Sequence, residues 1–137
     1  MPDRVYTGPL LDKLGVKAGS RVLIAGVDDP TFRRLLSERT SDVTDIRPGE
    51  SAPAGVDLVF LAAGSVEDLA RIGELRGAIV ANGAMWVVSR KGRAATLRDV
   101  EVMDAGRSFD MIDNKVVAFS ETHTSIRLVI PRALRPK

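Results

Sequence analysis

The stretch GSRVLIAGVDDPTF, residues 19–32, decides the fold class. Its apolar run, 21–27, is nearly continuous, which is typical of a strand that is covered on both faces in a parallel sheet. Asp29 and Pro30 then stand at positions typical of a helix N-cap and a first helical residue. A buried strand, a tight turn at Gly26 and a helix follow one another as in a nucleotide-binding βα unit.

The rest of the chain continues this alternation of strands and helices. Apolar runs of strand length recur, and apolar residues at helical spacing stand between them. We expect helices at 9–15, 29–40, 65–75 and 95–106, and strands at 21–27, 41–48, 56–65, 83–91, 114–121 and 125–131. In the fourth helix the expected apolar face is Leu97, Val100 and Met103.

The last two strands are separated only by residues 122–124, so they are expected to form an antiparallel hairpin. The sequence therefore predicts an α/β fold, a three-layer Rossmann-like sandwich with a mostly parallel sheet of about six strands. Runs 21–27, 56–63 and 84–89 should be central, and the hairpin should lie at one edge. Residues 1–137 are expected to form a single domain.

Composition excludes several kinds of site. The chain has 20 Lys and Arg against 18 Asp and Glu, and this excess of positive charge is too small to imply nucleic-acid binding. It has no cysteine and one histidine, which excludes disulfides, thiol catalysis and thiolate metal sites, and no metal site is expected. Because no signal peptide or membrane-spanning run is evident, we expect a soluble, cytoplasmic protein.

Two stretches carry a resemblance to a known fold family. LGVKAGSRVLIAG, residues 14–26, resembles the helix, turn and first strand of class I methyltransferases. SDVTDIRPGE, residues 41–50, resembles their second strand, which ends in an acid. The third strand of that fold has no counterpart here. The resemblance implies a methyltransferase-like core and places Asp45 where an acid binds the cofactor ribose, although an aspartate at a strand end is also common turn chemistry.

A narrower resemblance covers nearly the whole chain. YTGPLLDKLGVKAGSRV (6–22), GAMWVVSRK (83–91) and AGRSFDMIDNKVVAFSETHTSIRLVIP (105–131) are similar to a short bacterial family known as a domain of unknown function, number 3052. This resemblance implies a fold and a bacterial origin. It supplies no catalytic residues, so none is assigned.

The turn after the first strand argues against S-adenosylmethionine. The methyltransferases that this chain resembles have a G-x-G-x-G pattern at this turn. This chain has only the first glycine, Gly26, and continues with Val27, Asp28, Asp29 and Pro30. Asp28 would lie near the carboxylate of the cofactor and repel it. Asp29 would already occupy the helix N-terminus as its cap. We therefore expect no cofactor.

Ligands of open α/β sheets bind at the carboxyl ends of the parallel strands. The candidate binding residues at that edge are Gly26, Asp28, Asp29, Asp45, Ser65, Arg90, Lys91 and His123, with Ser89, Glu121 and Thr122 beside them. Each also has a structural interpretation. Asp29 and Ser65 suit helix caps, and Arg90 and Lys91 suit either a solvated loop or a clamp for an anion. His123 suits a hairpin turn, or a general base oriented by Glu121.

These observations favour a non-catalytic binding or interaction module with a degenerate cofactor loop. The alternative is an enzyme or cofactor binder that holds an anionic small molecule or S-adenosylmethionine in the crevice. We also expect a homo-oligomer, because residues 40–75 carry seven acids and residues 75–98 carry five bases and no acid. The strand 125–131 would add an exposed apolar face of Ile126, Leu128 and Ile130. Trp86 is expected in the core.

Overall fold

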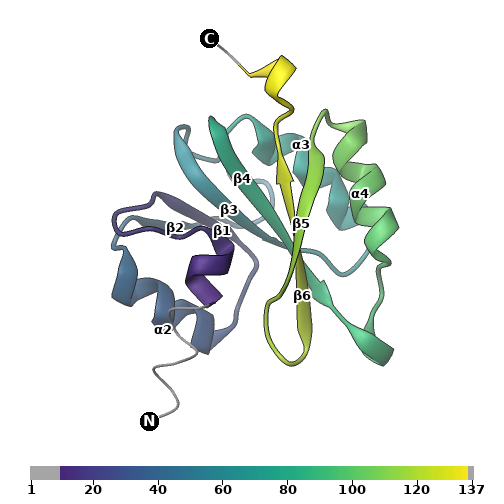
Figure 1. Cartoon of the computed structure of the whole chain (residues 1–137), viewed down its shortest axis with the longest axis horizontal. Helices are drawn as coiled ribbons and strands as arrows, with labels where there is room; N and C mark the ends of the chain where they lie inside the picture. Colours follow the sequence, from purple (N-terminus) through teal and green to yellow (C-terminus); the bar gives the residue numbers. More distant parts are fainter. Residues whose placement is uncertain (1–9, 136–137) are drawn as a thin grey trace.

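The structure, a computed structural model, describes residues 10–135, which contain a six-stranded sheet in the order β2-β1-β3-β4-β6-β5 (Figure 1). The first four strands are parallel to one another, and β6 is antiparallel to both β4 and β5. The strands are β1 (Val22–Ala25), β2 (Val43–Asp45), β3 (Val56–Ala62), β4 (Ile79–Arg90), β5 (Ile112–Ala118) and β6 (His123–Val129).

This sheet confirms the predicted fold class, the central place of the three apolar strands and the place of the hairpin at one edge. The strands with continuous apolar runs, β1, β3 and β4, are internal, while the short polar β2 is an edge strand. All four residues of β1 are buried, as expected for a strand with a helical layer on each side. The C-terminal hairpin completes the sheet at the other edge.

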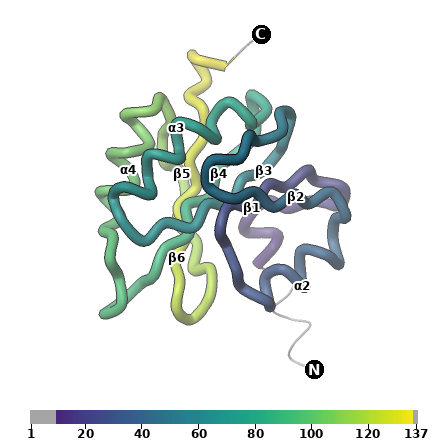
Figure 2. The backbone as a smooth tube through the Cα atoms, turned by 180° about the vertical axis from the view of Figure 1, so that it is seen from behind, coloured from purple at the N-terminus to yellow at the C-terminus, as the bar shows by residue number. Residues whose placement is uncertain are grey.

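Helices cover both faces of the sheet. Figures 1 and 2 show α3 and α4 on one side and α2 with the short helix at residues 10–14 on the other. Each side has its own buried apolar cluster. Trp86 belongs to the α2 side, is fully buried, and donates its indole N–H to the carbonyl of Leu14 at 2.9 Å, so its predicted core position is confirmed. The helical segments are α2 (Pro30–Arg39), η1 (Glu67–Ala70), α3 (Arg71–Arg76), η2 (Gly92–Ala94), α4 (Asp99–Ser108) and η3 (Arg132–Leu134).

The fourth predicted helix begins later than expected, and its expected apolar face is only partly buried: Met103 is half-buried and Val100 is exposed. The helix runs from Asp99 and not from residue 95, because the Glu101 carboxylate accepts the Arg98 backbone N–H at 2.8 Å and fixes the start there. Val102 is buried on this helix, while Val100 is 47% exposed. Leu97 is buried as expected, but from the loop before the helix.

The hairpin is also shifted from its predicted register. His123 is the first residue of β6 and pairs with Arg90 of β4, so it does not lie in the turn. The predicted exposed face was wrong: Ile126, Leu128 and Ile130 are at most 5% exposed, because β6 lies between β4 and β5. The strand at this edge is β5, and its exposed apolar residues are Ile112 and Val116. Self-association stays a prediction.

Within residues 10–135, no helix combines the length and hydrophobicity that a bilayer crossing requires. The same residues contain no group of three or more His, Cys, Asp or Glu side chains placed to hold a metal ion.

Candidate functional site

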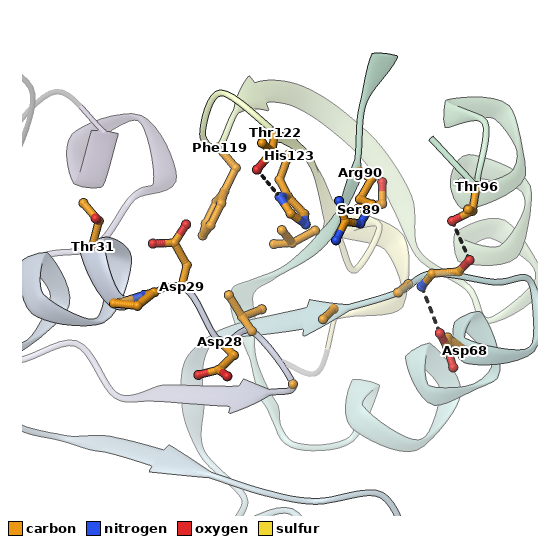
Figure 3. Close-up of a pocket in the computed structure, with 17 residues that line it drawn as sticks. Asp28, Asp29, Thr31, Asp68, Ser89, Arg90, Thr96, Phe119, Thr122 and His123 are labelled. Carbon is orange, nitrogen blue, oxygen red and sulfur yellow. Dashed lines mark hydrogen bonds between the residues drawn. The ribbon is translucent and has the colours of Figure 1, made fainter. Parts of the chain in front are cut away.

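An open pocket of about 850 Å³ lies at the carboxyl ends of β1, β3 and β4, the edge where the sequence predicts a crevice. The turns after β1 and β3, the end of β4 and the β5–β6 hairpin line it (Figure 3). The lining contains five of the predicted binding residues: Gly26, Asp28, Asp29, Arg90 and His123. The other three, Asp45, Ser65 and Lys91, lie outside this lining.

The turn after β1 is built around a glycine and a helix cap. Gly26 has a φ of +90°, a conformation that favours glycine. Asp29 is the N-cap of α2, as predicted, and its Oδ1 accepts the Phe32 N–H at 2.9 Å. Pro30 has no N–H to offer. The helix N-terminus therefore presents a carboxylate and few free donors, which is a poor setting for an anion.

Asp45 is held by an arginine of α2. Arg33 donates to both carboxylate oxygens of Asp45, at 2.6 and 3.1 Å, and also to the Val27 carbonyl at 2.9 Å. The Asp28 carboxylate lies 3.9 Å from the same guanidinium. The hydrogen bond from Arg33 lowers the pKa of Asp45 below its usual value. Asp45 thus stands at the end of β2, where the resemblance places it, but its carboxylate is engaged within the chain.

Replacing Asp45 by asparagine should lower the free energy of unfolding by about 1 kcal/mol or less near neutral pH, because the pair is half-exposed. A carboxyl whose pKa is lowered by folding stabilises the protein above its unfolded pKa of about 4, and this contribution is lost as pH falls through the folded pKa. The difference between wild type and Asp45→Asn in urea unfolding should therefore shrink below about pH 4. A difference that stays constant from pH 7 to 3 contradicts the pairing.

The turn after β3 is closed by two side chains. Gly64 donates its N–H to Asp68 Oδ2 at 2.9 Å, and its carbonyl accepts the Thr96 hydroxyl at 2.6 Å (Figure 3). Ser65 Oγ accepts the Asp68 N–H at 3.3 Å. The N-cap of the short η1 is Val66, so Ser65, the predicted cap, lies one residue before the observed cap position, and the Asp68 carboxylate bonds back to Gly64.

The end of β4 and the hairpin form the opposite wall of the pocket. Arg90 pairs with His123 across the strands, and the Lys91 N–H donates to the Thr122 carbonyl at 3.1 Å. The His123 Nδ1 contacts the Thr122 hydroxyl at 2.8 Å, so its partner is Thr122 and not the predicted Glu121. Ser89, beside Arg90, is 5% exposed and lines the pocket.

Charged side chains line the pocket on several sides. Figure 3 shows Asp28 and Asp29 on one side, Arg90 toward the other, and Asp68 at the turn after β3. Within residues 10–135, no carboxylate lies within ion-pairing distance of Arg90. An anionic group is therefore favoured beside β4 and disfavoured beside the turn after β1.

Sequence reasoning missed several residues of the lining, among them Asp68, Thr96 and Phe119. Phe119 is buried, and its ring centroid lies 4.9 Å from that of Phe32. Phe119 follows the apolar residues of β5, so the sequence indicated that it would be buried. Nothing in the sequence indicated that it would line a pocket. Thr96 follows a polar turn, and nothing local indicates that its hydroxyl reaches Gly64, 32 residues earlier.

Comparison with solved structures shows which fold this arrangement has. A SAM-dependent methyltransferase from Aquifex aeolicus is similar, with a TM-score of 0.68 and 16% identity over 95% of this chain and 94% of that one. The N-methyltransferase NodS from Bradyrhizobium japonicum WM9 has a TM-score of 0.66 and 13% identity, with 95% and 97% covered. The pyocyanin biosynthetic protein PhzM has a TM-score of 0.67 and 12% identity.

The match to PhzM covers 92% of this chain but only 54% of that protein, so this chain spans about half its length. No protein-family model and no curated protein matches the sequence. At these identities the structural likeness shows the fold alone. The chain has a methyltransferase-like Rossmann fold, with the pocket at the strand ends where that fold binds ligands.

Proposed function

We propose that the protein is a non-catalytic binding module that keeps a methyltransferase-like fold and does not use S-adenosylmethionine. One observation carries this proposal: the positions that would meet the cofactor are occupied by the chain's own side chains. Asp29 caps α2, and both carboxylate oxygens of Asp45 accept from Arg33.

These contacts fit the cofactor poorly. Its methionine carboxylate would approach the turn after β1, where Asp28 and Asp29 carry negative charge. Its ribose would have to compete with Arg33 for Asp45, and breaking a two-point guanidinium–carboxylate contact costs hydrogen bonds on both partners.

Isothermal titration calorimetry with S-adenosylmethionine tests the proposal. We expect no measurable binding at micromolar concentration, in the wild type and in Asp45→Ala alike. The matched control is Asp42→Ala, which removes a neighbouring carboxylate paired with Arg21. A micromolar dissociation constant that is lost in Asp45→Ala and kept in Asp42→Ala would refute the proposal.

A second candidate is an anionic small molecule in the same pocket, favoured by the exposed Arg90, which has no ion-pair partner among residues 10–135 and lies beside His123 and Ser89. Lys91 lies outside the lining and is not needed for it. A thermal-shift panel of nucleotides and carboxylic acids would find such a ligand, because binding to the folded state raises the melting temperature. The increase should be lost in Arg90→Gln.

We also propose a family, a cellular location and an oligomeric state for this protein. The resemblance of residues 6–22, 83–91 and 105–131 to the short bacterial family of unknown function supports membership of that family. The absence of cysteine supports a reducing, cytoplasmic location. The exposed Ile112 and Val116 on the edge strand β5 support a homo-oligomer.

A further inference from the structure

A second pocket, of about 400 Å³, lies at the opposite end of the sheet, away from the hairpin turn. The turn 15–20, the start of β3, residues 82–84 of β4 and Arg127 of β6 line it. In Figure 1 the carboxyl end of β6 points toward the C-terminus and the hairpin turn lies at the other end. This pocket is therefore separate from the candidate site described above, and the proposed function does not use it.

The positive charge of Arg127 lies in an environment that destabilises it. Arg127 is half-buried, and the one side-chain partner it has within residues 10–135 is Asn114 Oδ1, at the long distance of 3.4 Å. Burial, and then the charge of nearby Arg135, lower its pKa. A bound anion stabilises the charged form of a guanidinium that is partly desolvated beside a like charge. In the described part of the chain, no carboxylate forms an ion pair with Arg127.

Other cations gather around Arg127. Lys17 lines the same pocket, and Lys115 stands opposite Arg127 in the β5–β6 register. Lys115 Nζ donates to the Lys13 backbone carbonyl at 3.0 Å, so Lys115 reaches the helix at residues 10–14. We call Lys17, Lys115, Arg127 and Arg135 the basic cluster. Within residues 10–135, none of its members forms an ion pair.

This lack of pairing contrasts with other arginines of the chain. Arg21, Arg33 and Arg39 each form an ion pair with an aspartate. The pocket lining contains one carboxylate, Asp57, whose Oδ2 accepts the Arg21 backbone N–H at 2.9 Å. An anion in the pocket would therefore lie toward Lys17 and Arg127 and away from Asp57.

We propose that this pocket binds the phosphate group of a small molecule, held by Arg127 and Lys17. A phosphate dianion matches the two cations that line this pocket and the surplus positive charge of the basic cluster better than a single carboxylate does. The site is concave, and its lining contains no aromatic side chain on which a base could stack, so a compact ligand fits it better than a nucleic-acid strand.

Inorganic phosphate is the probe for a thermal-melting test on the full chain. With chloride at matched ionic strength as the reference, phosphate at tenfold its dissociation constant should raise the melting temperature by about 3–5 °C. Arg127→Gln should melt higher than wild type without phosphate, because a desolvated like-charge contact is removed. The same variant should bind phosphate at least about tenfold more weakly.

The matched control is Arg47→Gln, which removes an exposed arginine that does not line the pocket and should respond to phosphate like wild type. Asp57→Asn should bind phosphate more tightly, since the one carboxylate of the lining is neutralised. Lys17→Gln, at an exposed position, gives a second loss variant that does not depend on the folding of Arg127→Gln.

Equal phosphate shifts in wild type, Arg127→Gln and Lys17→Gln would overturn the proposal, because general exclusion of phosphate from protein surfaces stabilises all variants alike. Acetate that matches phosphate in effect would overturn the assignment of a phosphate ligand. A loss confined to Arg127→Gln and Lys17→Gln, with a gain in Asp57→Asn, supports it.

Discussion

Replacing Phe32 by alanine is expected to lower the free energy of unfolding by about 3–5 kcal/mol, the range for deletion of a fully buried aromatic ring. Phe32 is 1% exposed, and its ring centroid lies 4.8 Å from Phe60 and 4.9 Å from Phe119. These tilted contacts join α2 to β3 and to the hairpin. A loss of this size is a large part of the 5–15 kcal/mol that typically stabilises a domain.

Urea unfolding at 25 °C measures this loss. Phe32→Leu keeps most of the buried volume and should cost clearly less, while the exposed neighbour Thr31→Ala should stay within about 0.5 kcal/mol of wild type. A Phe32→Ala variant within about 1 kcal/mol of wild type would mean that the three rings do not form a packed unit. Because Phe119 lines the large pocket, the same variant should also weaken any ligand bound there.

The parts of the fold that could be predicted from the sequence are those in which a local pattern has one physical solution. The apolar runs of β1, β3 and β4 are long enough to require cover on both faces, which makes these strands internal. Asp29 followed by Pro30 is a helix start that needs no distant partner, and the Asp29 carboxylate does accept the Phe32 N–H.

Features that depend on distant contacts could not be predicted in this way. The apolar residues of 95–106 fit two helical faces. Val102 is buried because it packs in the apolar cluster with distant residues of the sheet, while Val100 is exposed. In the hairpin, the pairing of β6 with β4 draws His123 into the strand. The short spacing between the two strands in the sequence is compatible with a turn that includes His123 and with a turn that ends before it.

The candidate site was predicted in position but not in its internal pairing. The crevice follows from the carboxyl ends of the parallel strands, which the fold brings together. The Arg33–Asp45 contact does not follow from it, because it joins the exposed side of α2 to the end of an edge strand. That contact decides whether Asp45 is free for a ligand, so the fold was easier to predict than the function.

Gly83→Ala is the second substitution with a large expected effect, because the new methyl group would meet backbone. The register of β3 and β4 is irregular between the pairs Val56↔Ile79 and Leu58↔Ala84, and Gly83 lies in the part of β4 that bulges there. A Cβ at Gly83 would lie 2.6 Å from the Asp57 carbonyl oxygen and would also overlap the Ile79 side chain. A rotamer change can move Ile79, but only a shift of β3 can move the carbonyl.

We therefore expect Gly83→Ala to cost about 3 kcal/mol, at the upper end of the usual range for overpacking. Gly77→Ala is the matched control, since a Cβ there has no atom within 4 Å and its φ of −68° is ordinary for alanine. Urea unfolding of both variants separates steric overlap from loss of backbone freedom, because the second effect is common to them. Since Asp57 and Gly83 both line the pocket proposed to bind phosphate, a shift of β3 should also weaken phosphate binding in Gly83→Ala. Equal stability of the two variants would contradict the close approach of β3 to the bulge.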